Sequence, residues 1–319
     1  MATEALPELD AQYRLIREEA GLLDRSGRGK LSVSGAEAAE YLQGQLTNDI
    51  EALGPGEGCY CALLDRKGHL QADARALRLS EEEIWLDTEA ATTDALQRHL
   101  QTYKVGREVE VADVGSEWAI LSLLGPMAAG LAGALPGPEH SHGDGQPCGV
   151  AARWVATDLG IDLIVASAEA ARLRAALLEA GAAEISEQAA EIARVESGRP
   201  RFGAEMSAAA MPAEAGIVER AVDFEKGCYI GQEPVARLHH RGRPNRLLRG
   251  LRLSAAVSPG AELALGDRQV GEVGTVCVSP ALGPIALAIV RREAEPGDTL
   301  QVEGESATAE VVELPFKGA

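Results

Sequence analysis

Residues 225–233 read Glu225-Lys226-Gly227-Cys228-Tyr229-Ile230-Gly231-Gln232-Glu233, a stretch that combines a cation, a thiol, an aromatic ring, an amide and a carboxylate. Glycine tolerates positive backbone dihedrals, so Gly227 and Gly231 favour a sharp turn that holds Cys228 at an accessible tip. Lys226 is placed to favour the thiolate form of Cys228, which is the form that attacks or binds metal. The alternative is a buried structural cysteine in an ordinary turn, because a free cysteine behaves as a small hydrophobe.

The segment from Lys226 to Glu233 fits the pattern K-G-C-[FYT]-x-G-Q-E throughout and resembles the signature of the YgfZ family. These folate-binding-like proteins assist the maturation or repair of iron–sulfur proteins, with a connection to tRNA modification. They are related to the glycine-cleavage T-protein, an aminomethyltransferase. Similarity to this superfamily covers nearly the whole chain, at Gly21 to Ser26, Gln45 to Asp49, Leu124 to Pro126, Arg194 to Pro200, Ala236-Arg237, His239 to Gly242, Ala281 to Ala288 and Pro296-Gly297.

The resemblance implies an α+β, T-protein-like fold in which antiparallel sheets and helices surround a central channel and a β-barrel follows at the C-terminus. We expect residues 1–243 to form the folate-binding region as two interleaved lobes, and residues 244–319 to form the barrel domain. Length alone points to two or three lobes, because single cores stop growing at roughly 250–300 residues.

Local patterns predict the elements. Apolar spacing predicts helices over residues 11–20, 36–46, 90–101, 167–181 and 186–198, the second with a capping box at Ser34 and Glu37. Residues 24–33 are expected to form one strand, and the segments between residues 60 and 86 an antiparallel meander, because tight turns separate them. From Leu247 onward, short strands and turns predict a small β-barrel or sandwich.

Composition limits the functional classes. The formal net charge of -19 makes DNA an unlikely partner, and 3% aromatic content makes direct RNA binding unlikely as well. Five cysteines without a Cys-x-x-Cys pair predict neither a disulfide framework nor a self-contained metal site, and favour a reducing compartment. Met1 to Glu8 lacks the features of a secretory signal, and Gly and Pro interrupt the uncharged run from Trp118 to Pro138. We expect a cytoplasmic monomer without a membrane span.

A Pro- and Gly-rich stretch at residues 136–149 is predicted to be a flexible surface loop. It contains His140, His142 and Cys148, which are possible metal ligands. A fourth ligand is absent, so no metal site is expected there.

The resemblance also implies a tetrahydrofolate site. Tyr60 matches a tyrosine that lines the folate site of the T-protein, and Asp73 matches the aspartate that faces the reactive nitrogen of the folate. The pterin wall is implied by Asp162, Arg194 and Phe202. The chain departs from the T-protein pattern at Ala72, where a second aspartate is usual, and at Asp162, which replaces a glutamate in a segment shortened by one residue.

Two hypotheses of function follow. The first is an accessory factor for iron–sulfur proteins, whose partners are iron–sulfur enzymes or assembly proteins. Its key residue is Cys228, and Lys226 and Asp73 are expected to be catalytic with it. The signature loop is expected to comprise Gly227, Tyr229, Gly231, Gln232, Glu233 and Arg237 around the cysteine. Cys228 could ligate a cluster transiently, exchange thiols or accept an adduct from folate chemistry. The alternative is a folate-dependent aminomethyltransferase, which uses Asp73 but leaves the cysteine motif without a purpose.

A basic run from Arg237 to Arg249 contains five arginines and two histidines and no acidic residue. It is suited to a polyglutamyl folate tail, to acidic partner proteins or to RNA phosphates. A solvated linker between lobes is the alternative.

Overall fold

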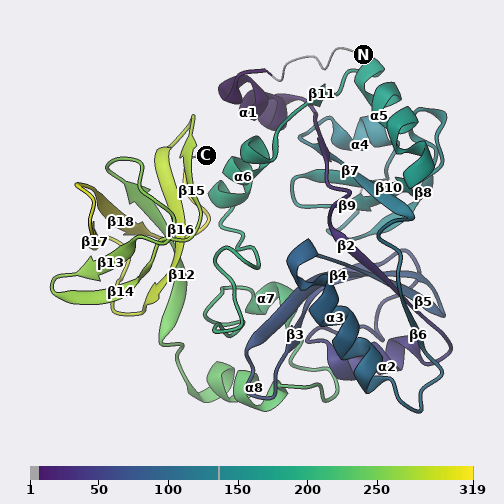
Figure 1. Ribbon diagram of the computed structural model, residues 1–319, viewed down its shortest axis with the longest axis horizontal. Helices are drawn as coiled ribbons and strands as arrows, with labels where there is room; N and C mark the ends of the chain where they lie inside the picture. The colour runs from purple at the N-terminus through teal and green to yellow at the C-terminus, as the bar shows by residue number, and fades with distance from the viewer. Residues whose placement is uncertain (1–6, 136, 319) are drawn as a thin grey trace. The chain divides into compact units, whose positions relative to one another are not determined.

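The computed structural model describes residues 7–135 and 137–318. Met1 to Leu6, which include most of the segment used to predict the absence of a signal, lie outside the described residues, as do Pro136 and Ala319. The chain divides into two compact units (Figure 1). Among the described residues, unit 1 comprises 7–64, 71–135, 137–190 and 220–230, and unit 2 comprises 65–70, 191–219 and 231–318. The predicted boundary between residues 243 and 244 stays a prediction.

Unit 1 contains a six-stranded sheet in the order β11-β1-β7-β10-β9-β8. Its strands are antiparallel to their neighbours except for the parallel pair β1 and β11. The strands are β1 (Gly21–Asp24), β7 (Trp118–Leu124), β8 (His142–Gly145), β9 (Ala152–Ala156), β10 (Gly160–Ala166) and β11 (Ala183–Glu184). Helices α4 (Ala128–Ala132) and α5 (Ala170–Glu179) share a buried core with this sheet. The opening helix α1 spans Leu9–Glu18.

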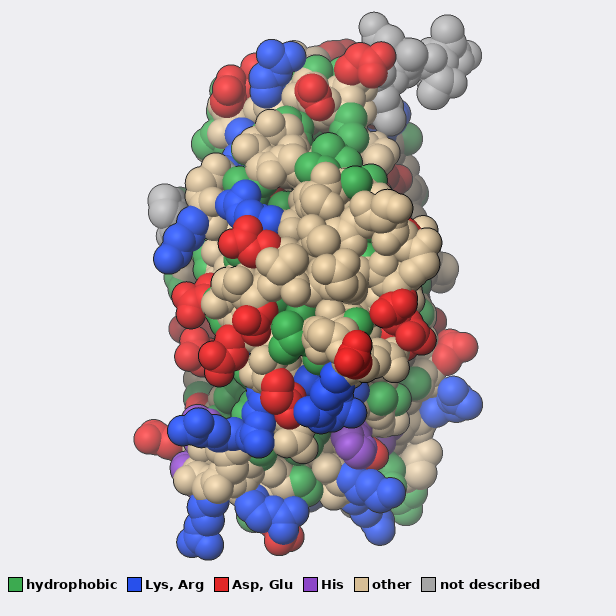
Figure 2. Space-filling view, turned by 90° about the vertical axis from the view of Figure 1, so that its left-hand side faces the viewer, with side chains coloured by type: hydrophobic (Ala, Val, Ile, Leu, Met, Phe, Trp, Pro, Cys, Tyr) green, Lys and Arg blue, Asp and Glu red, His purple; other side chains and the backbone are tan. Residues whose placement is uncertain are grey.

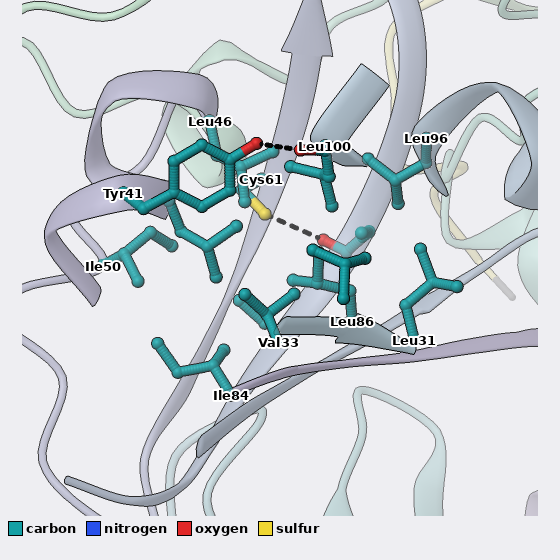
Figure 3. Close-up of a cluster of buried hydrophobic side chains, with 14 of the residues drawn as sticks. Leu31, Val33, Tyr41, Leu46, Ile50, Cys61, Ile84, Leu86, Leu96 and Leu100 are labelled. Carbon is teal, nitrogen blue, oxygen red and sulfur yellow. Dashed lines mark hydrogen bonds between the residues drawn. The ribbon is translucent and has the colours of Figure 1, made fainter. Parts of the chain in front are cut away.

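A five-stranded sheet in the order β3-β4-β5-β2-β6 completes the framework of unit 1. Its strands are β2 (Gly29–Ser34), β3 (Gly58–Leu64), β4 (Leu70–Ser80), β5 (Glu83–Thr88) and β6 (Glu110–Asp113). Helices α2 (Ala38–Gln45) and α3 (Ala90–Tyr103) pack on one face over the apolar cluster of Figure 3, where Tyr41 donates a hydrogen bond to the Leu100 carbonyl. The other face meets the six-stranded sheet through Leu77, Trp85, Ile120, Val155 and Ile164.

Strand alternation decides which side chains lie between the two sheets. Successive side chains of a strand point to opposite faces. Ala72, Ala74 and Ala76 of β4 enter the cluster beneath α2 and α3. Asp73 and Arg75 therefore project from the opposite face of β4, which is the face turned to the second sheet. On β3, Cys61 belongs to the same cluster, so Tyr60 shares the face of Asp73.

Unit 2 is built on a closed barrel of six strands in the order β12-β18-β17-β13-β14-β16, which closes through β12 and β16 and carries β15 beside β16. The strands are β12 (Arg246–Leu253), β13 (Glu262–Leu265), β14 (Arg268–Glu272), β15 (Val276–Ser279), β16 (Gly283–Arg291), β17 (Thr299–Val302) and β18 (Thr308–Val312). Val195 of α6 (Glu187–Glu196) packs against Ile285, Leu287 and Phe316. The predicted combination of antiparallel sheets, helices and a C-terminal barrel is confirmed.

Most predicted elements are confirmed, but four details were wrong. Residues 24–33 form two strands, because Asp24 accepts a hydrogen bond from the Ser26 amide and starts a turn. The capping box is absent, because the carboxylate of Glu37 binds Arg107 and the Glu108 amide instead. Part of the predicted loop at 136–149 is strand β8, paired with β9. Gln232, Glu233 and Arg237 lie in helix α8 (Gln232–Arg241) rather than in a loop.

Helix α8 starts where it does because Gly231 adopts the left-handed conformation at its N-cap, with φ of 83°, and Pro234 lies in the first turn. No helix among the described residues is long and apolar enough to cross a membrane.

Candidate functional site

Tyr60 and Asp73 meet on neighbouring strands β3 and β4. The Tyr60 hydroxyl donates a hydrogen bond of 2.7 Å to Oδ2 of Asp73. The other carboxylate oxygen, Oδ1, is shielded from solvent and has no hydrogen-bond partner within the described residues. A shielded acceptor without a donor is costly, so this atom is suited to receive a hydrogen bond from a bound molecule.

Burial tunes both groups. It raises the pKa of Asp73, and the hydrogen bond from Tyr60 and the positive charge of Arg28 offset this only in part. Burial and the neighbouring Asp73 carboxylate raise the pKa of Tyr60 well above its usual value, so the phenol stays protonated and remains a donor. A carboxyl group with a raised pKa can hold or release a proton closer to neutral pH than an ordinary aspartate.

A ladder of buried ion pairs lies beside this pair of residues. Arg75 Nη1 contacts Asp162 Oδ2 at 2.6 Å, and Arg75 also binds Asp87 on β5. Arg28 Nε binds Asp87 at 2.7 Å and its Nη1 contacts Glu89. Burial opposes ionisation of Asp87, but the guanidinium groups of Arg28 and Arg75 outweigh it and lower its pKa to about 2. The ladder joins the two sheets of unit 1 through charge.

Asp162 was predicted to hold the pterin, and the structure gives both of its oxygens partners inside the protein. Oδ1 accepts a hydrogen bond of 2.5 Å from the Ser122 hydroxyl, and Oδ2 forms the ion pair with Arg75. Asp162 is 3% exposed and Asp73 is half-buried, so neither is the solvated surface acid that such residues usually are.

The sequence interpretation missed Arg28, Arg75 and Asp87. A signal was present, because Arg75 and Asp87 interrupt otherwise apolar strands at alternating positions. Charged side chains in such positions are seldom buried unless they are paired. Their partners come from other strands, however, and could not be named from the pattern.

Arg220 is another residue that the sequence did not single out. Its guanidinium lies 4.9 Å from the centre of the Tyr60 ring, and its Nη2 contacts Glu139 at 2.7 Å. The amide of Asn48 binds the carbonyls of both Tyr60 and Arg220. One face of Tyr60 is thus covered by a cation that is held in place from two sides.

Arg194 and Phe202, the other predicted folate contacts, belong to unit 2. Arg194 uses its guanidinium on Glu191, Glu205, the Thr275 hydroxyl and the Arg199 carbonyl. Phe202 is half-buried and forms an isolated bridge with Met206. Whether these residues contact a folate stays a prediction.

The segment 220–230 is tied to the end of α2. The ammonium group of Lys226 donates to the carbonyls of Gln43, Leu46 and Asn48 at 2.6 to 2.8 Å. Two backbone amides of the segment bind the same region, that of Asp223 to Thr47 and that of Ile230 to Gly44. Burial lowers the pKa of Lys226 to about 8. Lys226 is therefore an anchor for the segment, a role that the sequence interpretation did not foresee.

Cys228 lies exposed between two buried neighbours, Lys226 and Tyr229. Since Lys226 and Ile230 on either side of it are each hydrogen-bonded to residues near the end of α2, the thiol is displayed by a fixed turn rather than by a loose loop. All five cysteines are free, and no group of metal-ligating side chains occurs in the described parts of the chain. His140 and His142 are buried, and burial lowers the pKa of His142 to about 4.

Two family models match the chain. The GCVT N-terminal domain matches residues 3–226, and the glycine cleavage T-protein C-terminal barrel domain matches residues 246–317. The chain is 31% identical over 321 residues to a protein of Rubrobacter xylanophilus named aminomethyltransferase, covering 97% of this chain and 86% of that protein. A protein of the same name from Streptomyces coelicolor is 31% identical, with 96% and 88% covered.

A crystal structure titled as glycine cleavage system aminomethyltransferase T from Bartonella henselae has a similar fold. It aligns with a TM-score of 0.85 and 23% identity, over 97% of this chain and 89% of that one. The two domain matches and the similarity over nearly the full length lead to one conclusion: this chain belongs to the glycine cleavage T-protein family.

Proposed function

We propose that this protein binds a reduced folate through Tyr60 and Asp73 and transfers a one-carbon unit, in the manner of a T-protein aminomethyltransferase. The observation that carries this proposal is Oδ1 of Asp73, which is shielded, lacks a donor within the described residues and belongs to a carboxyl group of raised pKa. The names of the relatives support a transferase better than they support the iron–sulfur accessory role that the Lys226 to Glu233 motif suggested.

The predicted folate contacts differ in how well they fit. Asp73 has an oxygen without a hydrogen-bond donor among the described residues, whereas the polar atoms of Asp162 and Arg194 already bind other groups of the protein. We therefore assign the binding role to Tyr60 and Asp73 first, and the folate contacts predicted for Asp162, Arg194 and Phe202 stay predictions. Tetrahydrofolate, when bound, supplies a ring nitrogen that accepts the one-carbon unit.

Asp73 is proposed to hold or move a proton at Oδ1. Tyr60 fixes the other oxygen, so the carboxyl group cannot turn its free oxygen away. The raised pKa brings the group toward the range in which proton transfer is efficient, and such catalysis contributes about 10²- to 10⁴-fold.

The test is formation of methylenetetrahydrofolate from an aminomethyl-loaded lipoyl carrier protein. Asp73→Asn keeps the size of the side chain and its contact with Tyr60 but cannot exchange a proton. We expect it to lower kcat by about 100-fold or more. The matched control, Cys228→Ala, should retain the wild-type rate. Full activity of Asp73→Asn, or a wild type with no activity on this substrate, would contradict the proposal.

A second candidate has its own supporting observation. Cys228 is exposed and rigidly displayed by a segment with hydrogen bonds to five residues in and just after the last turn of α2. We propose as the alternative that the protein belongs to the YgfZ branch and serves iron–sulfur proteins through this thiol. The chemistry of a displayed thiol includes ligation of a cluster as cargo and thiol exchange.

Complementation separates the two candidates. The gene is deleted in its host and restored as wild type, Cys228→Ala or Asp73→Asn, and iron–sulfur enzymes are assayed beside glycine cleavage. If the deletion lowers the activity of iron–sulfur enzymes and Cys228→Ala is the only form that fails to restore it, the accessory role is supported. If the deletion impairs glycine cleavage and Asp73→Asn is the only form that fails to restore it, the transferase function is supported.

A further inference from the structure

The outer face of α8 carries arginines that pair with no carboxylate in the part of the chain that the structure describes. Val235 is buried and Leu238 is half-buried, so they mark the inner side of the helix. With 3.6 residues per turn, Arg237 and Arg241 lie close together on the opposite side. Both are exposed, as is Arg243 just beyond the helix end. Within the described residues no carboxylate pairs with any of the three, although Glu233 lies one turn before Arg237.

Other arginines are matched to carboxylates, in the interior, as for Arg28 and Arg75, and at the surface, as for Arg107. Exposed arginines without such a match also occur singly, so the distinctive feature of α8 is that several of them lie together. The attraction of cations to the C-terminal end of a helix accounts for Arg241 in the last turn. It does not account for Arg237 in mid-helix or for Arg243 outside it.

Two other basic segments adjoin α8 within unit 2. The turn between β3 and β4 exposes Arg66 and Lys67, and it packs on α8 at Gly68, where an added Cβ would lie 3.2 Å from Pro234. The amide of Arg292 binds the carbonyl of Asn245, which places exposed residues of the β16 end beside the segment after α8. We call this area the basic surface; its residues are Arg66, Lys67, Arg237, Arg241, Arg243, Arg291 and Arg292.

Figure 2 shows Lys and Arg side chains, with His among them, gathered at the lower end of the face it presents, which is the end where α8 lies in Figure 1. The area stands out because the whole chain has a net charge of -19. Three segments distant in sequence supply the cations, so the charge is concentrated by folding.

We propose that the basic surface is a docking site for a short acidic segment of a partner polypeptide. The exposed face of a helix suits a macromolecule better than a small molecule, which is usually held in a concave site. The overall negative charge repels a long polyanion but tolerates a few carboxylates placed directly against the arginines. Helix α8 carries no Tyr, Trp or Phe on which nucleotide bases could stack. Alternate carboxylates of an extended peptide are about 7 Å apart, close to the roughly 6 Å between side chains one helical turn apart.

The test is fluorescence anisotropy with the full chain and a labelled ten-residue peptide of alternating Glu and Ser. A peptide with Gln in place of Glu and a ten-nucleotide uridine oligomer are the comparison probes. We expect the Glu peptide to bind more tightly than either probe, and its affinity to fall as salt is raised from 20 to 200 mM, values chosen to span roughly a threefold change in Debye length.

The decisive variant is the triple reversal R237E/R241E/R243E, and its matched control is R14E/R98E/R172E, which changes the net charge equally at exposed arginines on α1, α3 and α5. We expect at least about tenfold loss of Glu-peptide binding for the first and less than about twofold for the second. The variant R237Q/R241Q/R243Q removes the three charges without reversing them. It should also weaken binding of the Glu peptide, and it replaces the reversal if that variant disturbs folding.

Three results would overturn the proposal. One is equal loss of binding in both triple variants, which would mean that only the overall field acts. Another is binding of the uridine oligomer at least as tight as that of the Glu peptide, and the third is no binding of the Glu peptide at low salt.

Discussion

At the scale of single residues, two buried polar groups are held in opposite ways. Oδ1 of Asp73 lacks a donor within the described residues and its carboxyl group has a raised pKa, whereas the ammonium of Lys226 is surrounded by three carbonyls. An unsatisfied group costs stability and is available for function, and a satisfied one contributes to the structure. Of these two residues, both predicted to be catalytic, Asp73 is therefore available for function, whereas Lys226 contributes to the structure.

Replacement of Asp73 by Asn should stabilise the protein. Because burial raises the pKa of Asp73 in the folded state, the ionised form is penalised by folding above the unfolded pKa, which lowers stability at neutral pH. The Asn amide removes the charge, so we expect a higher Tm than that of the wild type at pH 7.5. The gain should be lost as the pH falls below about 4, where Asp73 of the wild type becomes protonated in the folded and the unfolded state.

Thermal unfolding followed across pH 3 to 8, a range of roughly one unit below to four above an ordinary Asp pKa, checks this expectation. Asp73→Ala is the control, since it also discards the hydrogen bond from Tyr60. A lower Tm for Asp73→Asn than for wild type at pH 7.5 would show that the carboxylate is not penalised.

Lys226→Met should destabilise the protein by about 2 kcal/mol, because it leaves buried carbonyls at the end of α2 without a donor. The pKa of Lys226 is lowered to about 8 from 10.5, so the unfolded state binds more protons between these values and the wild type gains stability as pH rises through them. The deficit of the Met variant should therefore grow between pH 8 and 10.5.

Urea unfolding at pH 7, 8.5 and 10, chosen to span roughly the interval around this titration, measures the deficit. The exposed Lys67→Met is the matched control and should change stability by less than about 0.5 kcal/mol. A deficit that shrinks with rising pH would contradict the anchoring role.

At the scale of elements, the alternation of strands β3 and β4 turns polar side chains inward between two sheets. Arg75, Asp87 and Asp162 come from three different strands, and the Arg75–Asp162 pair links the two sheets of unit 1. Such buried pairs stabilise little on balance, but loss of one partner leaves an uncompensated charge.

Arg75→Met should cost about 3–5 kcal/mol, since it removes the shared partner of Asp87 and Asp162. Arg107→Met, at a surface pair with Glu37 and Glu40, should cost less than about 1 kcal/mol. Chemical denaturation of the two variants beside the wild type tests the difference. Equal losses would mean that the ladder is no more important than a surface pair.

The same ladder predicts acid sensitivity. The folded pKa of Asp87 is depressed to about 2 from 3.8, so its contribution is fully present above about pH 4 and is lost as pH falls toward 2. Arg75→Met should reduce this loss, because one of the two guanidinium groups that depress the pKa is gone. Acid unfolding curves of the two proteins would show it as a shallower decline for the variant.

At the scale of the whole molecule, the barrel shares a core with segments outside residues 244–319. Val195 of α6 is fully buried against Ile285, Leu287 and Phe316. The boundary that we proposed from sequence would separate these contacts.

The fragment 244–319 should therefore fold less cooperatively than the barrel in the full chain. Its exposed Ile285, Leu287 and Phe316 should bind an apolar dye, and Val195→Ala in the full chain should cost about 2 kcal/mol. Dye fluorescence and calorimetry of the fragment test this. A fragment with a sharp unfolding transition and no dye binding would support the boundary at residue 244.

The sequence by itself determined the kinship with the T-protein, the barrel and most helices, because these depend on motifs and on apolar periodicity over neighbouring residues. Membership of the YgfZ branch stays a proposal. The sequence also indicated an accessible Cys228, which the structure exposes. Only the tertiary structure decided the partners of Asp73, Asp162 and Lys226, because those partners lie on strands and loops 13 to 183 residues away. The apolar pattern of a strand or helix indicates toward which face a side chain points, whereas the packing of distant segments decides which residues it contacts there.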